Sequence, residues 1–286
     1  MQVESTETML SQSAETVPTS SPVVRLRAVG ASFGGVTALA DVSADIRPGE
    51  IVAVVGPNGA GKTTLLNAIS GLLREAVTGQ ISVVDADTTK LKPQEVARLG
   101  VGRSFQEPRL IDEESAVENV LCGAHSLAQA GPFSQVLRPL MFRREERQLR
   151  ERAMEILARL GIEEIAELRV ADLSYGHRKL IDIGRAMMST PRVILLDEPT
   201  SGLDEHEQSA VVEILRGVHA ADPDLSMILV EHHMPMVSAV ATRIIAMQTG
   251  RVLLDDRPEV VLNSAEFKAA LVGRTSVDSS TSEGPN

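Results

Sequence analysis

The sequence predicts an α/β fold built on a doubly wound, largely parallel sheet. Short runs of Val, Ile and Leu without polar residues recur along the chain, as in parallel strands that are buried on both faces. Stretches with helical periodicity, such as residues 205–218, separate these runs. Only 2% of the 286 residues are aromatic, so the core of this fold must be aliphatic.

The strands of the sheet are expected at particular places. Residues 23–29 alternate apolar side chains with Arg25 and Arg27, which is typical of a half-exposed antiparallel strand. A helix with one apolar face is expected over residues 63–72, and an antiparallel β subdomain is expected beside the core. Continuous apolar runs indicate buried strands of the parallel sheet at residues 51–55, 193–196, 227–230 and 244–247.

A helical subdomain of about residues 107–172 is expected as an insertion in the core, because strand signals vanish there. The helix expected over residues 142–160 has one apolar face and one face dense in Arg and Glu. A basic, membrane-facing patch is one interpretation of the charged face. The pattern favours the other one, an exposed helix with i,i+4 ion pairs such as Arg147 with Glu151.

The two ends of the chain differ from the rest in composition. Residues 1–22 and 275–286 are rich in Ser and Thr and poor in apolar residues, so we expect disordered tails. The residues between these tails, 23–274, are expected to form one folded domain.

Bulk composition excludes several classes of function. The net charge is −11 and no long basic block occurs, which argues against nucleic-acid binding. The single cysteine, Cys122, excludes an intrachain disulfide framework and a multi-cysteine metal site. We find no secretory signal and no apolar run long enough for a transmembrane helix, so any membrane role is expected to come through a partner.

A complete phosphate-binding loop follows the strand expected at residues 51–55. Gly-x-x-x-x-Gly-Lys-Thr lies between a strand and a helix, which is the context this motif requires. Backbone N–H groups and the helix N-terminus attract the phosphates of ATP, Lys62 adds a cation, and the Thr63 hydroxyl is expected to bind Mg²⁺. The core is therefore expected to be a P-loop NTPase (RecA-like) core. Its expected ATP-binding residues are Gly56, Pro57, Asn58, Gly59, Ala60, Gly61, Lys62, Thr63 and Thr64.

Two adjacent carboxylates end the apolar run at residues 193–196. Asp197 should emerge at the carboxyl edge of the sheet, where ligands bind, and is expected to hold Mg²⁺. Glu198 is expected to polarise the water that attacks the γ-phosphate, since this chemistry depends on positioning. A simple turn carboxylate is the alternative for Glu198, and its place between Asp197 and Pro199 disfavours that alternative.

With further motifs in their expected order, residues 23–274 resemble the nucleotide-binding subunit of an ABC transporter. The resemblance implies that Phe33 stacks on adenine and that Gln106 senses Mg²⁺ and the γ-phosphate. It implies that His232 is a catalytic switch histidine. The signature motif then contains Ser174 and Gly176, and the D-loop contains Asp204. Two alternatives remain: Phe33 as a buried loop anchor, and His233 in place of His232.

The signature residues imply a second protein subunit. Ser174 and Gly176 precede a helix expected over residues 177–188, whose N-terminus suits an anion. The phosphate loop already binds one face of the nucleotide, so a second such end implies a second face. In the family that this chain resembles, two cassettes pack head-to-tail and trap two ATP molecules between them.

Several segments resemble the importers of branched-chain amino acids, most of all their longer ATPase subunit. These segments include residues 33–39, 173–176 and 230–234, whereas His177 and His233 depart from the usual pattern of that group. The resemblance implies transmembrane permease subunits and a second ATP-binding subunit, with a heterodimer favoured. It also implies indirect coupling to an external solute-binding protein and a place on the cytoplasmic face of the membrane.

Two other functions compete with transport. A soluble ABC ATPase acting on DNA or ribosomes is the main alternative, and the acidic balance with a single cassette opposes it. A small-molecule kinase with a P-loop would leave the signature residues and His232 without a purpose.

Overall fold

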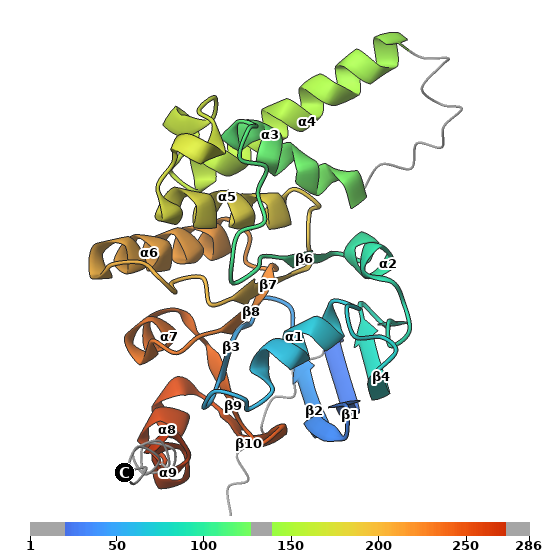
Figure 1. The fold of residues 1–286 in the computed structure, drawn as a ribbon, viewed down its shortest axis with the longest axis vertical. Coiled ribbons are helices and arrows are strands. Elements are labelled where there is room, and N and C mark those ends of the chain that lie inside the picture. The colour runs from blue at the N-terminus through green and yellow to red at the C-terminus, as the bar shows by residue number, and fades with distance from the viewer. Residues whose placement is uncertain (1–20, 127–138, 273–286) are drawn as a thin grey trace, which may run out of the picture.

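The computed structural model describes residues 21–126 and 139–272. Within them, the helices of residues 116–187 gather at one end of the molecule, the antiparallel sheet and the C-terminal helices lie toward the other, and the parallel sheet lies between (Figure 1). None of the helices in the described ranges is long and apolar enough to cross a membrane. The predicted α/β fold is confirmed.

The parallel sheet has the strand order β10-β9-β3-β8-β7-β6. Strand β3 pairs in parallel with β8 and β9, β7 pairs in parallel with β8 and β6, and β10 is antiparallel to β9. The four predicted buried strands are confirmed, each to within one residue at either end. The strands are β3 (Ile51–Val55), β6 (Val101–Arg103), β7 (Val193–Asp197), β8 (Ser226–Val230), β9 (Arg243–Gln248) and β10 (Arg251–Asp256).

Both faces of this sheet are covered. Along β3, residues Ile51, Ala53 and Val55 belong to one apolar cluster and Val52 and Val54 to another, as strand alternation requires. The first cluster continues into the helical layer and the second into the antiparallel sheet and α1 (Lys62–Ile69). Burial on both faces explains why these strands are continuous apolar runs.

The antiparallel sheet has the order β2-β1-β4-β5. The predicted antiparallel strand is confirmed, but it extends beyond residue 29 to Phe33. Register shifts between Leu26 and Ser32 allow its pairing with β2 to continue to Phe33, beyond the residues in which apolar and polar side chains alternate. The strands are β1 (Val24–Phe33), β2 (Val36–Ile46), β4 (Val77–Val83) and β5 (Ala86–Asp87).

The remaining helices connect or follow the strands. Helix α1 ends three residues earlier than predicted, because Ser70 caps it and Gly71 then turns the chain with φ of +76°. Helix α5 (Tyr175–Met187) begins two residues earlier than predicted. The other helices that connect or follow the strands are α2 (Pro93–Arg98), α6 (Glu205–Ala221), α7 (Met234–Val240), α8 (Pro258–Asn263) and α9 (Ala265–Val272).

The helical layer lies between β6 and β7 in sequence and consists of α3 (Ala116–Leu121), α4 (Pro139–Arg159) and α5 (Tyr175–Met187), with short 3₁₀ turns at Cys122–Ser126, Glu163–Ile165 and Val170–Asp172. Gly184 of α5 allows close packing, because an added Cβ would lie 3.0 Å from Leu160 and 3.2 Å from Val120. Arg147 and Glu151 form the expected i,i+4 pair at 3.7 Å on an exposed face. The helical subdomain expected over about residues 107–172 falls partly outside the described residues, and the domain limits stay a prediction.

Candidate functional site

The phosphate loop joins the carboxyl end of β3 to the start of α1. Two of its glycines have backbone angles and surroundings that exclude a side chain. At Gly56, with φ of +148°, an added Cβ would lie 2.1 Å from the carbonyl oxygen of Met247. At Gly61, with φ of +97°, it would lie 2.5 Å from the carbonyl oxygen of Ala38. Glycine at these two positions therefore allows the loop to pack closely against the backbone of Met247 and Ala38.

Lys62 lies inside this loop. Its side chain is buried, and Nζ donates to the carbonyl oxygens of Gly56 at 2.8 Å and Pro57 at 3.0 Å. Burial lowers the pKa of the Lys62 ammonium, while the carboxylates of Glu198 and Asp197 act in the opposite direction. A cation is thus held where the phosphates are expected to enter.

Asp197 ends β7 and has different partners for its two carboxylate oxygens. The Thr63 hydroxyl donates to Oδ1 at 3.3 Å, and Nη2 of Arg103 lies 3.4 Å from Oδ2. Burial raises the pKa of Asp197, and the nearby Arg103 guanidinium opposes that rise.

These oxygen donors fit Mg²⁺. A hydroxyl and a carboxylate lie side by side in Thr63 and Asp197, and hard oxygen ligands are what this ion prefers. Among the described residues, no group of three or more His, Cys, Asp or Glu side chains forms a complete metal cage. Mg²⁺ commonly takes one or two protein ligands and completes its shell with phosphates and water.

Two of the expected site residues, Gln106 and His232, meet at the side chain of a third, Glu198. Nε2 of Gln106 donates to Oε2 at 2.9 Å, and Nε2 of His232 lies 2.9 Å from Oε1. The Glu198 backbone has φ of +50°, a left-handed conformation that is uncommon outside glycine, and its N–H donates to the carbonyl of Val230. The structure therefore brings the end of β7, the segment after β6 and the segment after β8 to one carboxylate.

Of the two adjacent histidines, only His232 is placed at this carboxylate by the hydrogen bonds of the described residues. His233 is the residue before α7, and its backbone N–H lies 3.5 Å from Oε2 of Glu231.

Glu231 is a supporting residue that the sequence reasoning missed. Its buried carboxylate accepts hydrogen bonds from the backbone and hydroxyl of Thr200, at 3.0 and 2.7 Å, and from the backbone N–H of His232 at 3.0 Å. It thereby joins the loop after Glu198 to the segment that carries His232. A charged residue directly after a buried strand was the available signal.

Two buried charges on α5 also escaped the sequence reasoning. Nζ of Lys179 donates to the carbonyl oxygens of Gln106 and Glu198, the latter at 3.0 Å. Asp182, one turn later, accepts from the backbone N–H of Phe105 at 2.8 Å. Burial lowers the pKa of Lys179, which the Asp182 carboxylate opposes, and burial raises the pKa of Asp182, which the Arg185 guanidinium opposes most.

The remaining expected residues lie elsewhere on the surface of the protein. Ser174 caps α5, accepting from His177 N at 3.3 Å, and Asp204 caps α6, accepting from Glu207 N at 2.8 Å. Gly176 lies against α6, where an added Cβ would come 2.8 Å from Oε1 of Glu207. Phe33 is 43% exposed at the turn between β1 and β2, which rules out the buried-anchor interpretation.

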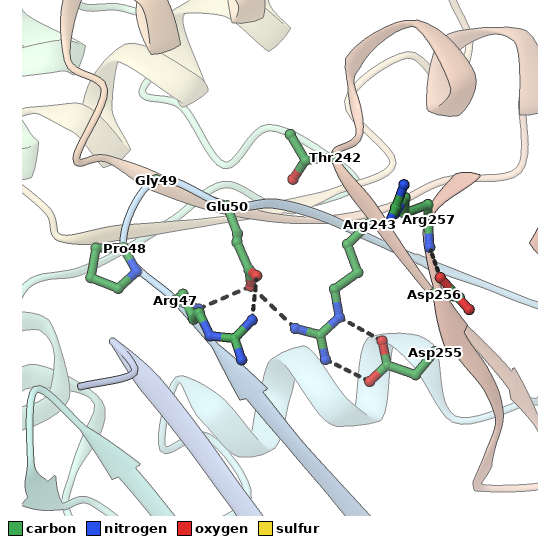
Figure 2. Close-up of a pocket in the computed structure, with 9 residues that line it drawn as sticks. All are labelled: Arg47, Pro48, Gly49, Glu50, Thr242, Arg243, Asp255, Asp256 and Arg257. Carbon is green, nitrogen blue, oxygen red and sulfur yellow. Dashed lines mark hydrogen bonds and ion pairs between the residues drawn. The ribbon is translucent and has the colours of Figure 1, made fainter. Parts of the chain in front are cut away.

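A cavity of about 570 Å³ lies at the opposite edge of the parallel sheet (Figure 2). Its charged side chains hold one another: Arg243 donates to both oxygens of Asp255 at 2.6 Å and to Glu50 at 3.2 Å. Arg243 also donates to the carbonyl oxygen of Asp45 at 2.8 Å. This arrangement indicates a structural junction between the two sheets.

Comparisons with known proteins agree on one family. Residues 39–201 match the family model described as ABC transporter, a range that includes the phosphate loop, Asp197 and Glu198. The high-affinity branched-chain amino acid transport ATP-binding protein LivG of Escherichia coli K12 is 34% identical over 257 residues, which are 89% of this chain and 99% of LivG. BraF of Pseudomonas aeruginosa, with the same description, is 32% identical over 258 residues, again 89% and 99%.

Solved structures give the same result. The ADP conformation of an ATP-binding cassette of an ABC transporter superposes with a TM-score of 0.74 at 26% identity, covering 87% of this chain and 97% of that one. A bacterial ABC transporter cassette solved as a dimer has a TM-score of 0.68 at 28% identity, covering 82% and 98%.

Proposed function

This chain belongs to the ABC transporter family, and we propose that it is the ATP-hydrolysing subunit of an importer for branched-chain amino acids or similar small polar solutes. As a member of that family it is an ATP-binding ATPase. The choice of solute is supported by the similarity to LivG and BraF across nearly their whole length. The observation that carries the catalytic proposal is the meeting of Gln106 and His232 at Glu198.

The phosphates of ATP occupy the loop from Gly56 to Thr64 in this proposal, and adenine stacks on the exposed ring of Phe33. Lys62 supplies a cation to the phosphates. Thr63 and Asp197 hold Mg²⁺, with Gln106 close enough to sense it. When bound, Mg²⁺ neutralises phosphate charge and orients the phosphates.

Glu198 acts as the base that orients the attacking water. Its side chain is held from both sides, so little orientational freedom is left to lose when the water binds. Each carboxylate oxygen has a second lone pair, and a water can therefore donate to Glu198 while Gln106 and His232 remain in place. His232 is expected to reach the γ-phosphate from the other side of this carboxylate.

A second ATP-binding subunit completes the site. Ser174 and Gly176 lie at the N-terminal end of α5, a helix of 13 residues whose first N–H groups attract an anion. We assign this end to the ATP held by the partner subunit. The dimeric solved cassette supports that arrangement. Permease subunits would hold the pair at the cytoplasmic face of the membrane and would couple it indirectly to an external solute-binding protein.

The test is isolation of the complex from cells that produce this chain. We expect transmembrane permeases and a second cassette to co-purify, and the complex in proteoliposomes to take up leucine with ATP and a loaded solute-binding protein. A complex with Lys62→Ala should show no uptake. Recovery of ribosomes or DNA in place of permeases would contradict the proposal.

A further inference from the structure

Arg103 is a buried cation at the nucleotide site for which the residue roles above give no task. It is the last residue of β6, and its register partner on β7 is Leu195. Because side chains alternate along a strand, Asp197 lies on the same sheet face as Leu195, next to Arg103. Only 8% of the Arg103 side chain and 4% of the Asp197 side chain are exposed.

The partners of Asp197 divide between its two oxygens. Oδ2 lies 3.4 Å from Nη2 of Arg103, and Oδ1 accepts from the Thr63 hydroxyl at 3.3 Å. With Oδ2 held by the guanidinium, the carboxylate cannot turn without breaking a contact between buried charges. Oδ1 is thereby kept beside Thr63.

A second contact fixes Arg103 itself. Nη1 donates to the Ser70 hydroxyl at 2.6 Å, and that hydroxyl in turn donates to the carbonyl oxygen of Leu66 at 2.9 Å. Ser70 caps the end of α1, the helix that begins at Lys62 and carries Thr63 in its first turn. One side chain therefore connects the strand that ends in Asp197 with the helix that supplies Thr63.

We propose that Arg103 is a positioning residue for Mg²⁺, which orients the Asp197 carboxylate so that Oδ1 and the Thr63 hydroxyl face the same ion. The inference rests on the proposed metal-binding roles of Asp197 and Thr63. The planar fork of the guanidinium is essential, because it reaches Asp197 and Ser70 from different nitrogens. A lysine ammonium is a single point of charge and cannot reproduce both contacts in the same geometry.

A purely structural ion pair is the competing explanation. Breaking a buried pair lowers stability whatever its function, so a loss of stability does not separate the two roles. The affinity for the metal does separate them. Residues that orient a metal ligand through hydrogen bonds typically change metal affinity about 10- to 100-fold when they are lost.

The experiment is a Mg²⁺ titration of nucleotide binding, with a non-hydrolysable ATP analogue and calorimetric detection. For Arg103→Met we expect the midpoint in free Mg²⁺ to rise about 10- to 100-fold. Arg103→Lys should fall between that variant and the parent protein. The matched control is Arg150→Met, which removes an arginine paired with Glu118 and Glu167 in the helical layer, and its midpoint should not move.

An unchanged midpoint in a folded Arg103→Met protein overturns the inference. Should that variant fail to fold, Ser70→Ala provides the decision, because it keeps the guanidinium and removes only the contact that fixes it. Its midpoint should shift in the same direction, and unchanged midpoints in both Ser70→Ala and Arg103→Lys would overturn the inference. If the parent protein itself bound the analogue without any dependence on Mg²⁺, the proposed metal site would be wrong and the role of Arg103 with it.

Discussion

Replacing Lys179 by methionine tests how α5, the helix that follows the signature motif, supports the hydrolytic site of its own chain. Nζ of Lys179 donates to the carbonyl oxygens of Gln106 and Glu198, and the side chain is only 2% exposed. Methionine has a similar volume, so the change leaves no large cavity and mainly removes the donor. Two partly buried carbonyl oxygens then lose their charged donor, while Ser201 N–H still donates to Glu198 at 3.2 Å and the Tyr175 hydroxyl to Gln106 at 3.4 Å.

The magnitude follows from those two acceptors. A hydrogen bond to a charged group contributes about 1.5–3 kcal/mol, and the ammonium makes two of them. The ammonium is itself disfavoured by burial, which lowers its pKa, and removing it returns part of that cost. We expect Lys179→Met to lower the free energy of unfolding by about 2–4 kcal/mol, and Lys179→Arg to lower it by less.

The assay is urea unfolding, with the slope against denaturant checked for constancy. Steady-state hydrolysis is then measured at a temperature where the variant is folded. Because the lost contacts fix the backbone of Gln106 and Glu198, kcat should fall more than the affinity for ATP. A variant whose free energy of unfolding lies within about 0.5 kcal/mol of the parent, as for most surface changes, would contradict this role of Lys179. So would a destabilised variant with unchanged kcat.

Two further outcomes are expected. Ser174→Arg should leave ATP bound to the phosphate loop of the same chain but abolish hydrolysis in the assembled dimer, because it places a bulky cation at the N-terminus of α5. Full hydrolysis by a dimer that carries this change in both cassettes would contradict the assignment of the signature motif. Arg243→Met should lower the free energy of unfolding, measured in urea, by about 2–4 kcal/mol, because it leaves the carboxylates of Asp255 and Glu50 without their shared partner. The nucleotide affinity of the folded protein, measured by calorimetry, should stay unchanged.

The sequence predicts the parallel strands well because a strand that is buried on both faces is a continuous run of apolar residues. The run at 51–55 is buried at every position in β3, so polarity and burial coincide. Helix ends are less predictable: the end of α1 depends on Ser70 and on a glycine turn, and no apolar periodicity encodes either. Strand β1 continues beyond the residues whose polarity alternates. Its register shifts allow pairing with β2 where the apolar and polar residues no longer follow a period of two.

For the site, residues that belong to contiguous motifs could be named in advance, and residues that act across the fold could not. The loop from Gly56 to Thr63 is recognised from a contiguous motif, although Met247 and Ala38 pack against two of its glycines. Arg103 meets Asp197 across 94 positions of chain, and Glu231 meets Thr200 across 31. Such a residue shows its role only when the sheet register and the burial of its partner are known.

Hydrolysis is proposed to depend on the Glu198 carboxylate, where Gln106 and His232 meet, and Glu198→Gln removes its charge. The variant keeps the side-chain shape and removes the charge that polarises water. We expect it to bind Mg-ATP with near-normal affinity while single-turnover hydrolysis becomes almost undetectable. Near-normal hydrolysis by Glu198→Gln would contradict the assignment of the base.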